Sequence, residues 1–232
     1  VINGPMIWSP DSNVLFGPVP ELRNYFCCNG IISGFSQSGG MGLLAAELII
    51  EGETKYDMFA WDMARFGAWA DKDFTKSRVG DQYANRFSIH FPNEERVAGR
   101  PVRTRPIYEM QKEIGAVMGL NYGWEHPLWF ADVPHLKDTN GFTRQNWWEP
   151  VGRECKMLRE NAGIIDISNF AKYLVRGEKA REWLDTVFAN NMPMAVGRSC
   201  LTPLISMRGG LAGDFTVTLM SKNEYWILGS GM

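Results

Sequence analysis

A stretch rich in glycine and serine near the start of the chain could hold a cofactor. The segment from Asn29 to Gly42 contains five glycines and runs directly into an apolar, alanine- and leucine-rich segment that ends at Ile50. Glycine lets the backbone approach a ligand closely, and the first turn of a helix offers unpaired N–H groups and the positive end of a dipole. This pattern favours an anionic or electron-rich cofactor. The spacing is not the dinucleotide fingerprint, however, and the glycines could serve only tight turns and close helix packing.

A strand before this stretch and a helix after it are needed to position it. Residues 25–28 read as a buried strand, and apolar residues at helical spacing predict a helix over residues 41–50, which Gly52 would end. Strand, glycine loop and helix are together typical of the closing part of an α/β layer, so the fold class we expect is mixed α/β (α+β). No crossover strand precedes them. We therefore expect the chain to be a segment whose first domain lies mostly upstream.

Composition excludes several classes of function. The 232 residues are 45% hydrophobic, enough for a sizeable core, and the net charge of −2 argues against a nucleic-acid partner. No apolar run approaches the length of a membrane span, so we expect no membrane insertion. The four cysteines form no CxxC pair and read as reduced, mostly buried thiols. The three histidines lack metal-ligand spacing, and we expect no metal site.

The remaining elements follow from periodicity and turn signals. Short strands are predicted at residues 5–8 and 14–16, and residues 108–118 have helical spacing that would dock a neighbouring domain with the help of Trp124, Trp129 and Phe130. The glutamates and arginines of residues 94–105 indicate a solvated face or an ion-pair network rather than a ligand clamp. His126 reads as structural. In the last third we predict helices at 148–163 and 178–188 and extended segments at 172–176, 201–205, 215–220 and 225–228, with a turn at 207–210.

The order of the motifs resembles one family, the dimethylglycine and sarcosine dehydrogenases. Three short motifs and the glycine stretch match the end of its flavin domain: Ser9-Pro10-Asp11, Phe16-Gly17-Pro18 and Asn24-Tyr25-Phe26. Residues 91–96, 99–103, 105–108 and 123–125 look like its central linker module. From about Trp147 the chain resembles the start of the folate-binding domain shared with the glycine-cleavage T-protein. The resemblance covers essentially the whole chain.

The resemblance implies that the glycine stretch lies against a flavin ring. In that family the following helix points its N-terminus at the ring's pyrimidine oxygen, where a positive dipole end stabilises the reduced, anionic ring. By position, the implied flavin contacts are Gly30, Ile31, Ser33, Gly34, Phe35, Ser36 and Gln37. Alternatively, Phe35 merely packs, and Ser36 and Gln37 satisfy the loop backbone. Gly4 stands where related monomeric sarcosine oxidases carry the Cys that attaches the flavin, and Cys27 and Cys28 read as core residues.

The second implied site is on the folate side. The segment Arg208-Gly-Gly-Leu-Ala-Gly-Asp214 matches the T-protein pattern, which makes Asp214 the carboxylate that accepts a proton from tetrahydrofolate or steadies the developing cation. The residues implied to contact folate are Phe170, Leu174, Asp214, Phe215 and Thr216, with Thr218 nearby. The alternative for Asp214 is a turn residue that bonds its own backbone. Leu201 stands where T-proteins usually carry Tyr, and Gly213 where they often carry a second Asp.

The resemblance implies an enzyme, although a 232-residue segment alone should be inactive. The implied reaction is flavin (FAD)-dependent demethylation of an N-methyl amine such as dimethylglycine or sarcosine, with one-carbon transfer to tetrahydrofolate. We expect residues 1–67 to end the flavin domain, 68–134 to form the linker module and 135–232 to begin the folate domain. An electron-transfer flavoprotein is a candidate partner, and the expected compartment is the cytoplasm, or the mitochondrial matrix in a eukaryote. Two other readings are a non-catalytic regulator resembling the regulatory subunit of pyruvate dehydrogenase phosphatase, and a folate-only aminomethyltransferase.

Overall fold

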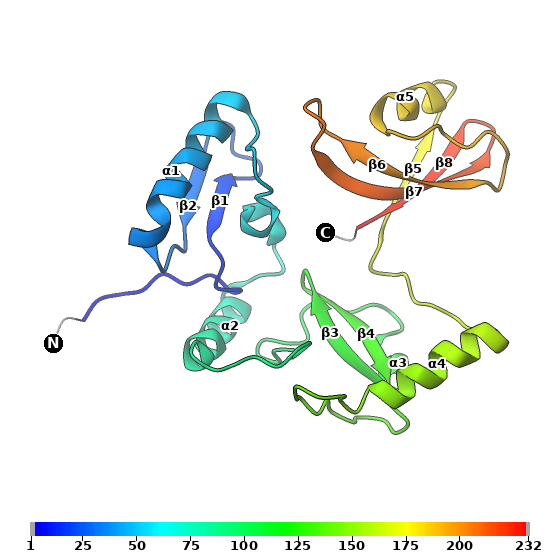
Figure 1. Ribbon diagram of the computed structural model, residues 1–232. Coiled ribbons are helices and arrows are strands. Elements are labelled where there is room, and N and C mark those ends of the chain that lie inside the picture. Colours follow the sequence, from blue (N-terminus) through cyan, green and yellow to red (C-terminus); the bar gives the residue numbers. More distant parts are fainter. Residues whose placement is uncertain (1–2, 231–232) are drawn as a thin grey trace. The chain divides into compact units, whose positions relative to one another are not determined.

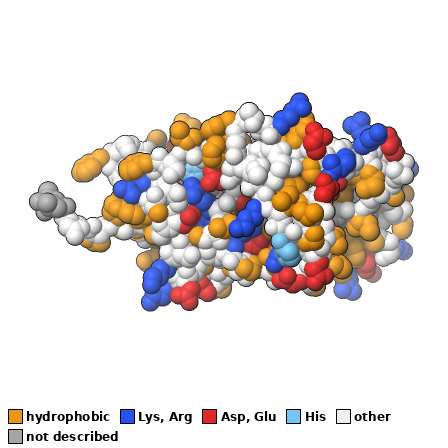
Figure 2. Space-filling model, turned by 90° about the horizontal axis from the view of Figure 1, so that it is seen from below, with side chains coloured by type: hydrophobic (Ala, Val, Ile, Leu, Met, Phe, Trp, Pro, Cys, Tyr) orange, Lys and Arg blue, Asp and Glu red, His pale blue; other side chains and the backbone are white. Residues whose placement is uncertain are grey.

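The computed structural model describes residues 3–230, which form two compact units. The first unit ends at Ala162 and the second begins at Gly163. Figure 1 draws the elements of both, and each unit is described here by itself. No helix among the described residues is long and apolar enough to cross a membrane. On the face drawn in Figure 2, basic and acidic side chains are interspersed, and neither charge dominates.

The first unit opens with a two-stranded antiparallel ribbon covered by a long helix (Figure 1). Its elements are β1 (Leu15–Pro18), β2 (Phe26–Asn29) and α1 (Gly34–Glu51). Helix α1 buries Met41 and Leu44 against Val14 and Phe16, which form a small apolar cluster. Residue Gly52 ends the helix in the left-handed conformation with φ of 80°, as the sequence predicts.

Three expectations for this region are wrong. Residues 5–8 form no strand, since they have no ladder partner among the described residues. Strand β2 is not buried, and its Phe26 is 43% exposed. Helix α1 begins at Gly34, so most of the glycine stretch is helical rather than a loop. Glycine in a helix costs about 1 kcal/mol relative to Ala, and the burial of Met41 and Leu44 in the same helix offsets part of that cost.

The middle of the first unit consists of short elements and one hairpin. They are η1 (Phe59–Trp61), η2 (Met63–Arg65), α2 (Lys72–Asn85), α3 (Tyr108–Glu113), β3 (Ala116–Asn121) and β4 (Trp124–Phe130). The helix expected over residues 108–118 has only six residues, because Gly115 turns the chain into β3 with φ of 101°. The carbonyl of Ala131 fills the space where a side chain at Gly115 would lie.

Helix α4 (Trp148–Glu160) closes the first unit close to where the sequence predicts it. It ends at Asn161 rather than Gly163. The face with helical spacing is not buried among the described residues, since Cys155 is exposed and Leu158 is 49% exposed. All four cysteines are free, and none is fully buried, which contradicts the expectation of mostly buried thiols.

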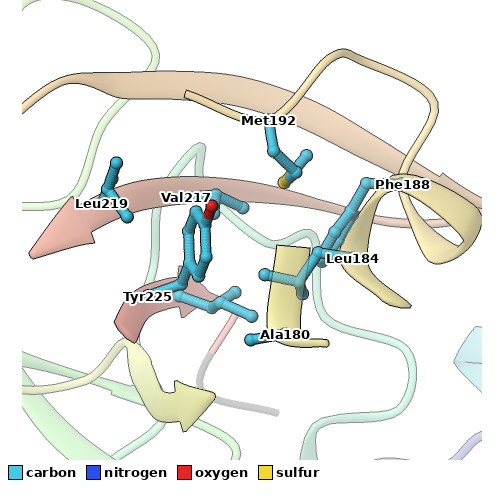
Figure 3. Packing of buried hydrophobic residues seen from close by; sticks show 8 residues of the cluster. Ala180, Leu184, Phe188, Met192, Val217, Leu219 and Tyr225 are labelled. Atoms are coloured by element: carbon cyan, nitrogen blue, oxygen red, sulfur yellow. The ribbon is translucent and has the colours of Figure 1, made fainter. Parts of the chain in front are cut away.

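The second unit is a four-stranded antiparallel sheet with one helix packed on one of its faces (Figure 1). The elements are β5 (Ala171–Arg176), α5 (Ala180–Val187), β6 (Ser199–Ile205), β7 (Leu211–Ser221) and β8 (Glu224–Gly229), in the strand order β5-β8-β7-β6. Leu184 of α5 is fully buried against Val217 and Tyr225 of the sheet (Figure 3). The predicted helix and all four predicted extended segments are confirmed, with shifts of a few residues at their ends.

Candidate functional site

The turn that leads from β2 into α1 requires glycine at position 30. Gly30 is buried with φ of 71°, a conformation that side chains rarely adopt. A Cβ there would lie 3.5 Å from the carbonyl oxygen of Asn13 and 3.8 Å from Ser9 Cβ. The glycine therefore keeps the entry into α1 pressed against the turn formed by residues 9–13.

The first turn of α1 presents several of the predicted flavin contacts together. Phe35 is fully exposed, and Ser33 and Ser36 are exposed beside it. Ser36 Oγ donates to the carbonyl oxygen of Ser33 at 3.0 Å, so this hydroxyl does satisfy local backbone. No side chain caps the helix start, and no acidic residue lies in its first turn, which leaves the positive end of an 18-residue helix uncompensated.

Two predicted contacts lie partly outside this exposed group. Ile31 packs against the apolar cluster of β1 and α1. Gln37 is half-buried, and its backbone N–H donates to the carbonyl oxygen of Ser33 at 3.1 Å. The alternative that Phe35 only packs inside the protein is wrong among the described residues, because its side chain is fully exposed.

A buried ion pair fixes the turn that supports Gly30. Arg65 donates from Nε to Asp11 Oδ2 at 2.8 Å and from Nη2 to Asp11 Oδ1 at 3.0 Å. Its Nη2 also donates to the carbonyl oxygen of Asn13 at 3.3 Å, and its side chain is 5% exposed. Sequence reasoning placed Asp11 in a motif but gave no role to it or to Arg65. Nothing local links two residues that are 54 positions apart.

A second buried pair organises the β3–β4 hairpin. Arg100 donates from Nε to Glu125 Oε1 at 2.9 Å and from Nη2 to Glu125 Oε2 at 2.7 Å, and Nη1 lies 3.4 Å from Glu95 Oε2. Burial disfavours the charged guanidinium, but the hydrogen bonds and attraction of Glu125, together with Glu95, outweigh it and raise the pKa of Arg100. The ion-pair network predicted for residues 94–105 is confirmed; Glu94, Glu95, Arg96 and Arg100 are half-buried, and their partner Glu125 is buried.

Neighbouring positions in this region are held by other contacts. The guanidiniums of Arg103 and Arg105 lie 3.7 Å and 3.3 Å from the ring centroid of Trp124. His126 is half-buried with an Nδ1 atom that has no hydrogen-bond partner among the described residues. Among the same residues, no cluster of three His, Cys, Asp or Glu side chains is placed to hold a metal ion.

In the second unit, the predicted folate residues mostly share the sheet face that α5 does not cover. Residues directly opposite each other on antiparallel strands point to the same face. Leu174 of β5 pairs with Trp226 of β8, and Thr216 of β7 pairs with Leu201 of β6. Leu174, Trp226 and Leu201 are each 45% to 66% exposed. We call this surface the open face.

Asp214 lies on the open face, inside β7 and opposite Pro203. Its side chain is exposed, and the carboxylate makes no hydrogen bond or ion pair with any described residue. The alternative of a turn residue bonded to its own backbone therefore does not hold. The turn at 207–210 lies several residues earlier and is closed by Ser206, whose N–H donates to the carbonyl oxygen of Gly210 at 2.7 Å.

Phe215 is the predicted folate residue that the structure separates from the others. Successive side chains of a strand point to opposite faces, so Phe215 lies on the α5 side, with its ring centroid 5.4 Å from that of Phe188. Phe170, just before β5, is 50% exposed. Trp226 was missed, although the alternation of Tyr225 and Ile227 with Trp226 in the last strand is a readable signal for its position on the open face.

Comparisons with known proteins find two family models in order along the chain. Residues 51–104 match the family model of the FAD dependent oxidoreductase central domain, and residues 107–232 match that of the GCVT N-terminal domain. Mitochondrial dimethylglycine dehydrogenase of Mus musculus is 35% identical over 100% of this chain and 27% of its own length. Mitochondrial sarcosine dehydrogenase of Homo sapiens is 29% identical over 95% of this chain and 27% of its own.

A relative of a different kind matches over the same region. The mitochondrial regulatory subunit of pyruvate dehydrogenase phosphatase from Mus musculus is 28% identical over 98% of this chain and 27% of its own length. The chain thus spans about a quarter of the length of these curated relatives. The GCVT N-terminal domain model matches residues 107–232, more than half of the chain, so the chain belongs to that domain family. Along nearly its whole length it is also similar to the dimethylglycine and sarcosine dehydrogenases.

Proposed function

We propose that the protein containing this segment demethylates an N-methyl amine such as dimethylglycine or sarcosine, with flavin as oxidant and tetrahydrofolate as one-carbon acceptor. The observation that carries the proposal is the match of one chain to an FAD dependent oxidoreductase central domain followed directly by a GCVT N-terminal domain. The segment alone is expected to be inactive.

The flavin side rests on the first turn of α1. Flavin, when bound, supplies a hydride acceptor for oxidation of the amine. The contacts we propose are Gly30, Ile31, Ser33, Gly34, Phe35, Ser36 and Gln37, by position in the family. The uncapped helix start supports this assignment, because its free positive end would attract the negative charge that a reduced isoalloxazine gains. The exposed ring of Phe35 offers an apolar contact beside it.

The folate side rests on the open face. Tetrahydrofolate, when bound, supplies a nitrogen nucleophile for the one-carbon unit. The residues proposed to hold it are Leu174, Thr216, Asp214 and Phe170, while Phe215 supports them from the opposite face of β7. The carboxylate of Asp214 has no competing partner among the described residues, so it is free to accept a proton from the attacking nitrogen. Asp214 is the catalytic residue we assign to this segment.

The domain bounds, the cellular compartment and the electron acceptor are part of the same proposal. We assign residues 1–67 to the flavin domain, 68–134 to the linker module and 135–232 to the folate domain; the two family models meet between residues 104 and 107. The mitochondrial relatives support the mitochondrial matrix as the compartment in a eukaryote. For a bacterium, the compartment we propose is the cytoplasm. An electron-transfer flavoprotein is the proposed acceptor of the electrons.

The test uses the full-length protein that contains this segment. We expect it to purify with a flavin absorption spectrum that bleaches when dimethylglycine or sarcosine is added without oxygen. The variant Asp214→Asn should reduce formation of methylene-tetrahydrofolate at least tenfold and leave flavin bleaching unchanged. Glu178→Gln, an exposed acid elsewhere in the second unit, is the matched control and should change neither readout. Equal loss of both readouts in Asp214→Asn would contradict the assigned division of labour.

The second candidate is a non-catalytic regulator, and the match to the phosphatase regulatory subunit favours it. A regulator would bind a partner and leave its flavin, if it holds one, unbleached by either amine. A folate-only aminomethyltransferase would purify without the flavin spectrum but still transfer a one-carbon unit. Flavin bleaching and one-carbon transfer, measured together, separate all three readings.

A further inference from the structure

The first unit contains a hollow that the proposed chemistry does not use. It has a volume of about 320 Å³, which lies at the small end of the range for ligand pockets. It is lined by Asn93, Glu95, Leu128, Trp129, Asp138, Gln145, Trp147 and Val151. None of these residues is assigned to flavin or folate. We call this hollow the two-tryptophan pocket.

The indole rings of the pocket are held in place by their N–H groups. Trp129 is 4% exposed, and its Nε1 donates to Asp138 Oδ1 at 2.7 Å. Trp147 Nε1 donates to Gln145 Oε1 at 2.8 Å. Both indole donors are therefore occupied within the protein. What the rings can still offer a ligand is their apolar surface and the negative potential of their faces.

The polar groups of the pocket suit a cation and not an anion. No Lys, Arg or His is among the described residues that line it. The Nε2 amide of Gln145 is already used, because it donates to the carbonyl oxygens of Gly141 and Pro92 at 2.9 Å and 3.2 Å. An anion would therefore find few free donors, whereas a cation would find two carboxylates.

The charge of Asp138 is not balanced by an ion pair with a described residue. Glu95 shares the single guanidinium of Arg100 with Glu125, which lies closer to it, at 2.7 Å against 3.4 Å. Glu95 also attracts Arg78, so Asp138 is the carboxylate of the pocket lining that lacks an ion-pair partner among the described residues. A ligand that enters the pocket meets a negative potential. Water screens this potential little, because the protein around the pocket has a lower dielectric constant than bulk water.

We propose that the two-tryptophan pocket binds a small alkylated ammonium ion. The indole faces attract such a cation, Leu128 and Val151 accept its methyl groups, and Asp138 supplies the opposing charge. Methylated ammonium groups are recognised in proteins by this combination of aromatic walls and a nearby acid. This binding requires neither flavin nor folate, so it can be tested independently of the proposed reaction.

The test measures binding to the full chain with choline and with 3,3-dimethylbutan-1-ol, which has the same shape but no charge. We expect choline to shift the indole N–H signals of Trp129 and Trp147 in a ¹H–¹⁵N spectrum and to leave that of Trp183, an exposed tryptophan of α5, unchanged. The uncharged alcohol at the same concentration should shift none of them. Equal shifts with both compounds, or no shift with choline, would overturn the proposal.

Two variants sharpen the result. Asp138→Asn keeps an acceptor for Trp129 Nε1 but removes the charge, and we expect it to weaken choline binding about tenfold. Trp147→Leu should weaken it by a similar factor. The matched controls are Glu113→Gln, an exposed acid of the same unit, and Trp183→Leu, and both should bind choline as the unchanged chain does. An unaltered affinity in Asp138→Asn, with its Trp129 signal in the original position without choline, would also overturn the proposal.

Discussion

The two candidate cofactor surfaces are both exposed, but they are supported in different ways. The start of α1 rests on a four-residue apolar cluster and on the Arg65–Asp11 pair, which ties together chain segments 54 residues apart. The open face rests on a continuous apolar layer between the sheet and α5, with eight buried residues. The first arrangement depends on a few directional contacts, and the second on shared burial.

This difference predicts whether a substitution causes local or global unfolding. A charge pair holds one specific turn, so its loss should open that turn and leave distant parts folded. An apolar layer supports every strand above it, so a cavity in it should weaken the whole unit. The open face should thus lose its shape only when the second unit unfolds, whereas the start of α1 can lose its support locally.

The largest effect is expected from Leu184→Ala in α5. Leu184 is 0% exposed, and removal of its side chain should lower the free energy of unfolding of the second unit by about 3 kcal/mol. Urea denaturation followed by circular dichroism measures the loss. Leu211→Ala, the same change at a position that is 73% exposed, should cost less than about 0.5 kcal/mol. Similar costs for the two variants would contradict a core-supported open face.

A smaller and more local effect is expected from Asp11→Asn. This change leaves the buried guanidinium of Arg65 without its counterion, and we expect a loss of about 2 kcal/mol, below the usual range for a fully buried pair because Asp11 is 32% exposed. Hydrogen exchange should speed up in residues 9–13 and around Gly30 but not in β5–β8. Faster exchange in both units would break the comparison. Asp132→Asn disrupts the exposed pair with Arg153 and should have little effect.

The smallest effect concerns two thiols, one in each unit. Burial, and then Cys27, raises the pKa of Cys28, while burial, and then Asp185, raises the pKa of Cys200. Since the raised pKa belongs to the folded state, each contribution to stability is complete below pH 9.0 and is lost as the pH rises beyond it. The rate of alkylation by iodoacetamide, followed by mass spectrometry, should reach half of its maximum above pH 9.0 for both thiols.

Two variants separate the causes for the thiols. Cys27→Ser should move the profile of Cys28 to lower pH and leave that of Cys200 in place. Asp185→Asn should move the profile of Cys200 to lower pH and leave that of Cys28 in place, because Asp185 raises the pKa of Cys200 but not that of Cys28. A shift of both profiles by either variant would mean that the two units are coupled more closely than the separate supports imply.

The second unit follows its sequence closely. Alternating apolar positions fit the strands predicted at residues 215–220 and 225–228, and periodicity predicted the helix at residues 178–188. The same alternation contained the information that Phe215 and Trp226 point to opposite faces. Local patterns sufficed there because each strand has one buried and one exposed face, which fixes its register.

The first unit follows its sequence less well. The glycine stretch was predicted as a loop because glycine is a poor helix former, yet tertiary packing of Met41 and Leu44 makes it helical. The helix expected after Tyr108 stops early, because Gly115 must fit against Ala131. Both errors arise because contacts with residues distant in the sequence decide these elements, whereas periodicity reflects only neighbouring residues.

The sequence by itself determined the order of the family's segments, the stop of α1 at Gly52 and the strands that carry Asp214. Only the tertiary structure decided that Arg65 holds Asp11, that Glu125 neutralises Arg100, and that Trp129 and Trp147 line one pocket with Asp138. The physical reason is range. Propensity, capping and alternation act between neighbours in the chain, whereas charge pairing and pocket formation depend on which distant segments the folded core brings together.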